Sequence, residues 1–132
     1  MAEKHTRPEL CHTERVVGGA TVVEVRGEID ILTASPLSAR IDALTAGRRP
    51  DLVLDLRPMT FIDCSGLRVL CRARNRVLAH EGRLRLVNPD GHFLVMLRTT
   101  HLGGVFEIHP DVPTALFGDR NDDAVSVAAG LQ

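Results

Sequence analysis

Residues 51–70 have the sequence DLVLDLRPMTFIDCSGLRVL, in which a strand pattern is followed closely by a helix pattern. The first six residues carry three consecutive apolar side chains, which is typical of a strand buried on both faces of a parallel sheet. Beyond Asp63 the apolar residues recur at helical spacing, which predicts an amphipathic helix that starts at or near Ser65. By its position around the helix axis, Arg74 falls within this apolar stripe. Its charged group must therefore extend to solvent, pair with another polar group or lie on a contact surface. The other members of the stripe are Leu67, Leu70, Cys71, Val77 and Leu78.

The residues before this unit predict a β-hairpin and a first helix. Residues 21–28, TVVEVRGE, alternate apolar and polar side chains as a half-buried strand does, and residues 16–19, VVGG, supply a partner strand and a turn. Thr33 or Ser35 can then cap a helix that Gly47 ends. The apolar face of this helix comprises Ala34, Leu37, Ile41 and Leu44.

Strands and helices continue to alternate after Gly82, which ends the second helix. Asn88 precedes a proline and is suited to cap a helix, and Asp111 with Pro113 begins a short final helix. The pattern predicts, in order, a strand over 83–87, a helix from Pro89 to about Thr100, a strand over 105–109 and a short helix through Phe117.

This order of elements predicts an α/β fold, with an N-terminal β-hairpin and then alternating helices and strands around a mixed, mostly parallel sheet. The pattern does not settle whether the helices cover one face of the sheet or both. The chain has 132 residues, which fits one compact domain. We expect residues 1–15 to form an N-terminal extension, residues 16–117 the domain and residues 118–132 a flexible C-terminal tail.

Composition excludes several classes of function. A net charge of -1 and a pI near 6.6 give no general attraction to a phosphate backbone, so we expect no direct nucleic-acid binding. The apolar stretches are shorter than the roughly 18–20 residues that span a membrane, and residues 1–10 lack the apolar segment of a signal peptide. We therefore expect a cytoplasmic protein with no membrane contact. The six histidines lack ligand spacing, so we expect no metal site and no cofactor.

The segment Asp63-Cys64-Ser65-Gly66 directly precedes the second helix, at a strand-to-helix junction of the kind where functional groups collect in α/β sheets. Ser65 has two alternative roles there. As an N-cap, its hydroxyl would accept a hydrogen bond from a helix amide and contribute about 1 kcal/mol. As a phosphoacceptor, it would present a dianion to the same amides and to the positive end of the helix dipole. Gly66 would then let a kinase approach the backbone closely.

Two segments carry a resemblance to a known family. Residues 54–70, LDLRPMTFIDCSGLRVL, together with residues 25–33, VRGEIDILT, resemble the STAS family, the domain of sulfate transporters and anti-sigma factor antagonists. The similarity extends from about Val16 to Phe117. In the antagonist branch, the serine or threonine before the glycine is phosphorylated by a partner that is both a serine kinase and an anti-sigma factor.

The resemblance implies that Ser65 is the phosphoacceptor, with Asp63 two residues before it and Asp30, in the loop after the second strand, close to it. Unphosphorylated protein would bind the anti-sigma factor and free the sigma factor, phosphorylation would end this binding, and a PP2C-type phosphatase would reverse it. The expected partner-binding residues are Asp30, Asp63, Cys64, Ser65, Gly66, Arg68 and Arg72.

The polar face of the second helix carries Arg68, Arg72 and Arg76. These arginines fit a partner-facing surface beside Ser65, and they fit a solvated helix face equally well. The sequence alone does not separate the two interpretations.

The cysteines predict free thiols. Cys11, Cys64 and Cys71 have no CxxC spacing, and seven residues of helix would separate Cys64 from Cys71 by roughly 10 Å, too far for a disulfide bond. Cys64 stands where family members often have serine or threonine. It therefore leaves Ser65 as the only hydroxyl in the motif, and it places a thiol at a helix N-terminus, where a lowered pKa would favour oxidation.

The same motif raises two alternative functions. An enzyme would use Ser65 or Cys64 as a nucleophile, but a nucleophile elbow needs glycine where Asp63 stands, and no histidine is placed as an obvious base, so we expect no enzymatic activity. A small STAS accessory subunit of a transporter or of a stress-sensing complex is the stronger alternative. The neighbouring genes distinguish the two functions. A gene for a kinase-fold anti-sigma factor would favour the antagonist, and genes for an ABC transporter would favour the accessory subunit.

Overall fold

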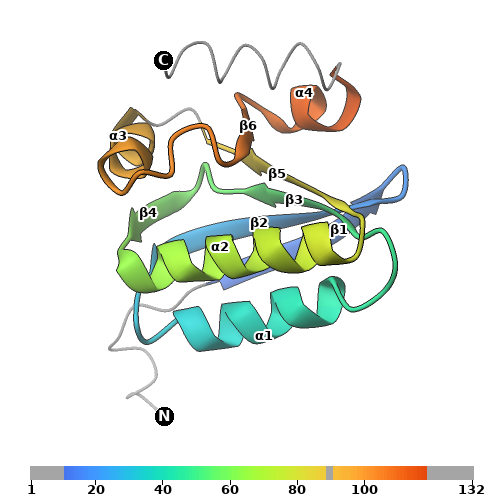
Figure 1. Ribbon diagram of the computed structural model, residues 1–132, viewed down its shortest axis with the longest axis horizontal. Helices are drawn as coiled ribbons and strands as arrows, with labels where there is room; N and C mark the ends of the chain where they lie inside the picture. Colours follow the sequence, from blue (N-terminus) through green and yellow to red (C-terminus); the bar gives the residue numbers. More distant parts are fainter. Residues whose placement is uncertain (1–10, 89–90, 119–132) are drawn as a thin grey trace.

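The computed structural model describes residues 11–88 and 91–118, and the predicted extension up to residue 10 and the tail from residue 119 lie outside these ranges. One mixed sheet has the strand order β1-β2-β3-β5-β6, with β4 paired to β2 (Figure 1). The β1–β2 pair is antiparallel and the other pairs are parallel, so the predicted fold class is confirmed. The elements in chain order are β1 (Cys11–Val17), β2 (Ala20–Ile29), α1 (Ala34–Leu44), β3 (Asp51–Asp55), β4 (Met59–Ile62), α2 (Cys64–Ala79), β5 (Arg83–Val87), α3 (Gly91–Thr99), β6 (Glu107–His109) and α4 (Val112–Phe117).

The N-terminal hairpin forms as predicted, with a longer first strand. Gly18 and Gly19 have φ values of 58° and 88°, which glycine adopts without strain and which suit a tight turn between twisted strands. Strand β1 begins at Cys11, so residues 11–15, which the sequence pattern assigned to the N-terminal extension, belong to the sheet. The sequence of these residues does not alternate between apolar and polar side chains. The reason is that β1 is an edge strand whose side chains from His12 to Val16 are mostly exposed.

Strand β4 is a feature that the sequence analysis missed. Strand β2 pairs with β3 over Thr21–Glu24 and then with β4 over Gly27–Ile29. Strands β3 and β4 therefore lie one after the other along β2. Figure 1 shows the kink between them. Pro58 interrupts the pattern there, because proline lacks the N–H that a continuous strand would donate to its neighbour.

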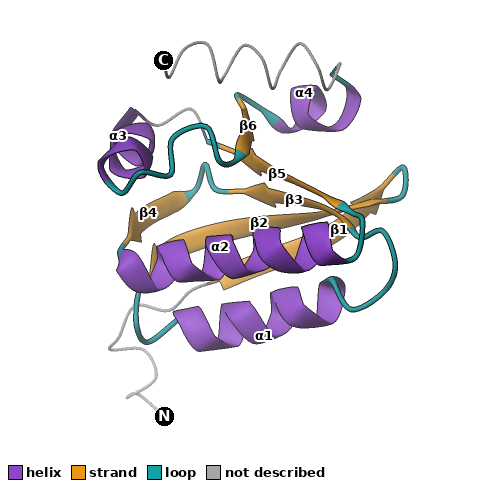
Figure 2. Cartoon of the chain, in the orientation of Figure 1, coloured by secondary structure: helices purple, strands orange, loops and turns teal. Residues whose placement is uncertain are grey.

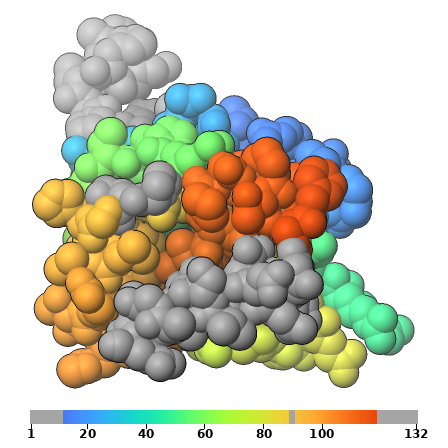
Figure 3. All heavy atoms as spheres, turned by 90° about the horizontal axis from the view of Figure 1, so that it is seen from above, coloured from blue at the N-terminus to red at the C-terminus, as the bar shows by residue number. Residues whose placement is uncertain are grey.

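The helices cover both faces of the sheet, which the sequence left open (Figure 2). Helices α1 and α2 pack on one face around a large apolar cluster that includes Leu37, Leu54 and Leu70. Helix α4 covers the opposite face, where Val53 and Ala115 belong to a smaller cluster. Figure 3, viewed from above, shows α4 and α3 next to each other at the surface on the side away from α1. None of the helices in the described ranges is long and apolar enough to cross a membrane.

Several details differ from the sequence pattern. Helix α1 ends at Leu44 with Thr45 as its C-cap, before Gly47. Leu78 is 54% exposed and lies outside the core, whereas Ala73 is fully buried. Arg74 forms a pair, since its Nε donates to the carbonyl oxygen of Val105 at 3.1 Å.

Among the C-terminal elements, β6 differs from its predicted bounds. Helix α3 begins at Gly91, and the predicted first-turn residue Pro89 lies outside the described residues. Strand β6 is shorter than predicted and begins at Glu107. The short final helix begins after Asp111 as predicted, and Asp111 is its N-cap, because its carboxylate accepts from the Thr114 N–H at 2.8 Å.

Candidate functional site

The predicted site residues meet at one end of the sheet, where β2 and β4 end. The backbone N–H of Asp63 donates to the carbonyl oxygen of Ile29 at 3.2 Å, which joins the chain before α2 to the end of β2. Because β2 and β4 are parallel, the loop that contains Asp30 and the start of α2 lie at the same end of the sheet. The topology thus brings together two segments that lie more than thirty residues apart in the sequence.

Asp63 is the N-cap of α2. Its backbone is extended, with φ -116° and ψ -166°, and its Oδ1 accepts from the N–H groups of Ser65 at 2.8 Å and of Gly66 at 3.2 Å. The helix therefore begins at Cys64, one residue before the expected start. Of the two alternative roles of Ser65, the structure excludes the N-cap, because the Asp63 carboxylate already accepts from the amides that a capping side chain would bind.

The Ser65 side chain is left without a structural hydrogen bond. It is half-buried, and within residues 11–88 and 91–118 its hydroxyl makes no hydrogen bond to the protein. It lines a shallow hollow of about 310 Å³ between the start of α1 and α2, together with Ile31, Ser35, Ser38 and Arg68. The described fold therefore does not depend on a hydrogen bond from this hydroxyl.

Gly66 has a packing role. A Cβ atom on this residue would lie 2.5 Å from Cγ1 of Ile62 and 2.9 Å from the carbonyl oxygen of Ile29. Both distances are shorter than normal van der Waals contact. Gly66 therefore allows the first turn of α2 to lie directly on the ends of β2 and β4, and this packing accounts for the glycine.

Asp30 shapes the loop between β2 and α1. Its Oδ1 accepts from the backbone N–H groups of Leu32 at 2.9 Å and of Thr33 at 3.1 Å. The Thr33 hydroxyl accepts from the Asp30 N–H and donates to the carbonyl oxygen of Glu28 at 2.7 Å. Asp30 thus holds the loop beside the α2 start in one conformation, as aspartate side chains commonly do in turns.

Exposed apolar side chains lie at this end of the sheet, and the sequence analysis missed them. In the loop held by Asp30, Ile31 is 76% exposed and Leu32 is 60% exposed, and Phe61 on β4 is 49% exposed. Ile31 lines the hollow beside Ser65, whereas Phe61 lines a separate pocket with residues of α3. Exposed apolar groups of this kind are typical of a protein interface. The signal in the sequence was the pair Ile31-Leu32 inside a predicted loop, where polar residues are expected.

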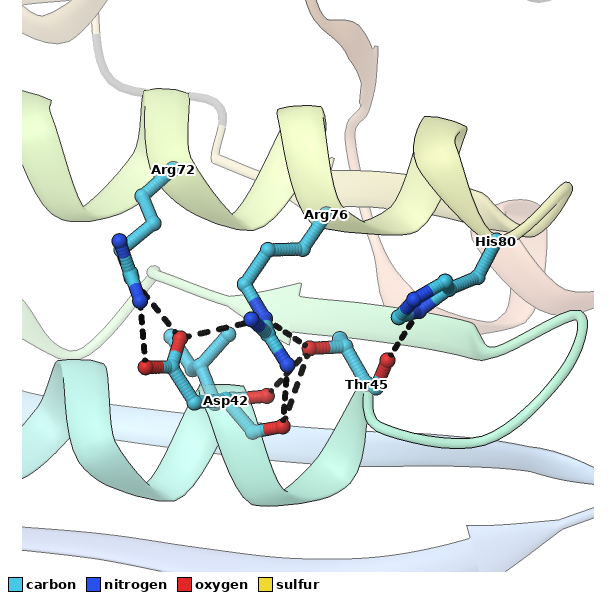
Figure 4. A network of polar contacts seen from close by, with 6 residues as sticks. Asp42, Thr45, Arg72, Arg76 and His80 are labelled. Carbon is cyan, nitrogen blue, oxygen red and sulfur yellow. Dashed lines mark hydrogen bonds and ion pairs between the residues drawn. The ribbon is translucent and has the colours of Figure 1, made fainter.

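Arg72 and Arg76 join the two helices on this face (Figure 4). Arg72 donates from Nε and Nη2 to the two carboxylate oxygens of Asp42 on α1, both at 2.9 Å. Arg76 donates to the hydroxyl of Thr45 at 2.9 Å and to the backbone oxygen of Asp42 at 3.0 Å. The hydrogen bond from Arg72 lowers the pKa of Asp42. Arg68 is exposed and forms no such bond within the described residues, so the three arginines do not form one uniform surface.

A second, larger depression runs along α2 next to the hollow between α1 and α2, and Arg68 and Arg72 line both. It has a volume of about 600 Å³, and Leu67, Cys71 and Leu102 contribute to its apolar lining. Cys64, which is exposed, and the half-buried Cys71 also border it, and both thiols are free. In the part of the chain that the structure describes, no three His, Cys, Asp or Glu side chains are placed to hold a metal ion.

Comparisons with known proteins agree with this geometry. The family model described as the STAS domain matches residues 12–115. The anti-sigma-F factor antagonist RsfB of Mycobacterium tuberculosis is 32% identical over 112 residues, which cover 85% of this chain and 84% of RsfB. The crystal structure of an anti-sigma factor antagonist from Mycobacterium paratuberculosis has a TM-score of 0.72 and 29% identity, covering 81% of this chain and 91% of the other.

The fold is also shared with SpoIIAA, a Bacillus cell fate determinant. Its unphosphorylated form has a TM-score of 0.61 and 18% identity over 91% of this chain and 99% of SpoIIAA. Its phosphorylated form has a TM-score of 0.59 and 18% identity over 76% and 93% of the two chains. The chain described here therefore belongs to the STAS domain family, and within it to the anti-sigma factor antagonist branch.

Proposed function

We propose that this chain binds an anti-sigma factor with serine kinase activity through the surface around Ser65, and that phosphorylation of Ser65 ends this binding. A PP2C-type phosphatase would remove the phosphate and restore it. The protein acts by binding alone and has no catalytic turnover of its own. The observation that carries this proposal is the Ser65 hydroxyl, which is accessible and makes no hydrogen bond within the described residues.

The surroundings of Ser65 support a binding surface. Ile31, Leu32 and Phe61 provide exposed apolar area at the same end of the sheet, and Asp30 holds the loop that presents two of them. A loop that is already ordered loses little conformational entropy when a partner covers it. The relatives named above are anti-sigma factor antagonists, and SpoIIAA exists in a phosphorylated form, which is consistent with the same chemistry here.

Phosphorylation would oppose binding through charge. A phosphoserine carries about 1.5 to 2 negative charges at neutral pH and would lie two residues from the Asp63 carboxylate. When a partner covers this surface, both charges lose water. An uncompensated charge in an interface costs several kcal/mol, which corresponds to more than a hundredfold in affinity.

The proposal is tested with purified kinase-type anti-sigma factors encoded in the same genome. Wild type, Ser65→Ala and the control Ser35→Ala are each incubated with the kinase and ATP, and intact mass and complex formation are measured. We expect one phosphate on wild type and on Ser35→Ala, and none on Ser65→Ala. Phosphate on Ser65→Ala, or an undiminished complex with phosphorylated wild type, contradicts the proposal. Failure of every such kinase to bind favours a transporter subunit.

A further inference from the structure

Three backbone amides in the first turn of α2, those of Ser65, Gly66 and Leu67, are already occupied, so they are not free to receive a phosphate on Ser65. The N–H groups of Ser65 and Gly66 donate to the Asp63 carboxylate, and the N–H of Leu67 donates to the Asp63 carbonyl oxygen at 3.0 Å. The helix start thus carries a bound carboxylate of its own chain. A phosphate on Ser65 would meet this negative charge and must be compensated from another direction.

The hollow beside Ser65 offers the missing compensation. It has a volume of about 310 Å³ and lies between α1 and α2, with the hydroxyls of Ser35 and Ser38 on one side and Arg68 and Arg72 on the other. Residues three positions apart on a helix have Cβ atoms about 5–6 Å from each other, so the guanidinium of Arg68 can reach a phosphate on Ser65. Phosphate oxygens accept strong, charge-assisted hydrogen bonds from guanidinium groups.

Of the two arginines in the hollow, Arg68 is the available one. Arg72 already donates from Nε and Nη2 to Asp42. Arg68 is exposed, and within residues 11–88 and 91–118 it makes no hydrogen bond or ion pair. Holding a phosphate would therefore cost Arg68 no contact that stabilises the unmodified protein.

We propose that Arg68 binds the phosphate of phosphorylated Ser65 within this hollow and holds it against α1. This inference rests on the proposed function, because it concerns the phosphorylated form. The contact neutralises part of the new charge inside the protein, so that the domain keeps its fold. It also removes Arg68 from the partner-binding surface. Binding of the anti-sigma factor then loses the attraction of Arg68 in addition to being opposed by the charge of the phosphate.

The test places phosphoserine at position 65 during translation, so that no kinase is needed. The second pKa of the phosphate, near 6 for a free phosphoserine, is measured by ³¹P NMR titration. A neighbouring cation favours the dianion, so Arg68→Gln should raise this pKa by about half a pH unit or more relative to wild type. The control Arg48→Gln removes an exposed arginine from the loop after α1 and should leave it unchanged.

A second measurement separates direct contact from a general effect of charge. In the phosphorylated wild type, the Nε–H signal of Arg68 should shift with the same midpoint as the phosphate, and this shift should be absent in the unmodified protein. Equal phosphate pKa values in Arg68→Gln and Arg48→Gln, or a larger effect from Arg72→Gln, overturn the inference. These measurements need no kinase. A failure of the Arg68 contact can therefore be distinguished from a failure of the proposed phosphorylation of Ser65.

Discussion

Asp63 and Ser65 lie two residues apart, and their side chains have different tasks. Asp63 accepts from two helix amides and determines where α2 begins. Ser65 contributes only its backbone N–H to that arrangement, while its hydroxyl makes no hydrogen bond within the described residues. A residue that can be modified without loss of a structural contact is suited to a regulatory mark, because the fold does not depend on its unmodified state.

Removing each side chain separates these tasks. Asp63→Ala should reduce the free energy of unfolding by about 1 kcal/mol, within a range of about 0.5–2, because it removes the cap of α2. Ser65→Ala should change it by less than about 0.5 kcal/mol. Urea denaturation of the two variants and wild type checks this. An equal loss in both variants would show that the Ser65 hydroxyl also stabilises the helix start.

Gly66 permits a second prediction at the scale of a single residue. Gly66→Ala should destabilise the protein by about 1–3 kcal/mol, because the new methyl group would meet Ile62 and the backbone oxygen of Ile29. This loss exceeds the gain of up to about 1 kcal/mol from the better helix propensity of alanine. The control is Gly91→Ala at the start of α3, where a Cβ atom would meet nothing within 4 Å. Similar stability of the two variants would contradict the packing role of Gly66.

Helices α1 and α2 are held together by charge as well as by apolar packing. Asp42 accepts from Arg72 and Arg76, and His80 at the end of α2 contacts the carbonyl oxygen of Thr45 at 2.7 Å (Figure 4). These contacts lie along the side of the helix pair and extend to the hollow beside Ser65, which Arg72 also lines. They fix the relative position of the two helices that form the hollow.

The Asp42 contacts make stability depend on pH. Asp42 has a lowered pKa in the folded protein, chiefly because Arg72 donates to its carboxylate. Its contribution is therefore fully present above the pKa of the unfolded chain, about 3.9, and is lost as pH falls through the folded pKa. We expect Asp42→Asn to lose stability relative to wild type at pH 7, by a small amount because the pair is partly exposed, and this difference to shrink towards pH 3.

Urea denaturation at several pH values measures this effect. Glu81→Gln is a suitable control, because Glu81 is exposed and makes no ion pair within the described residues. Its stability should follow that of wild type at each pH. A difference between wild type and Asp42→Asn that stays the same from pH 7 to pH 3 would show that the carboxylate charge is not involved.

The sheet topology of the whole molecule assembles the proposed partner-binding surface. The parallel pairing of β2 with β4 places Ile31 and Leu32, which follow β2, at the same end as Phe61 and the start of α2. Apolar area and the Ser65 side chain therefore lie at the same end of the sheet. A partner that covers this end of the molecule also covers Ser65.

At this scale we predict the effect of a permanent charge on binding. Ser65→Asp should weaken binding to the kinase-type anti-sigma factor by about a hundredfold or more, whereas Ser65→Ala should bind as wild type does. Both variants should keep the circular dichroism spectrum of wild type. The control Ala46→Asp adds the same charge in the loop after the C-terminal end of α1, away from Ser65, and should bind normally. Calorimetric titration measures the affinities, and wild-type affinity of Ser65→Asp would contradict the charge mechanism.

Local patterns predicted the order of the elements and the family. Apolar residues repeat with period two in β2 and with the helical period in α2, since side chains must face the core at these intervals in any strand or helix. The motif around Ser65 could be recognised because its residues are consecutive. Whether Ser65 caps α2 stayed open in the sequence, because aspartate and serine are both suited to the N-cap and the sequence does not show which side chain reaches the amides.

The sequence by itself determined the α/β fold class, the alternation of strands and helices and the junction at which Ser65 stands. Only the tertiary structure decided that residues 11–15 extend the edge strand, that β4 continues along β2 after Pro58, and that Arg72 bonds to Asp42 while Arg68 stays available. Short-range periodicity reports which side of an element faces the core. Contacts between residues thirty positions apart depend on how whole elements dock, and no local pattern contains that information.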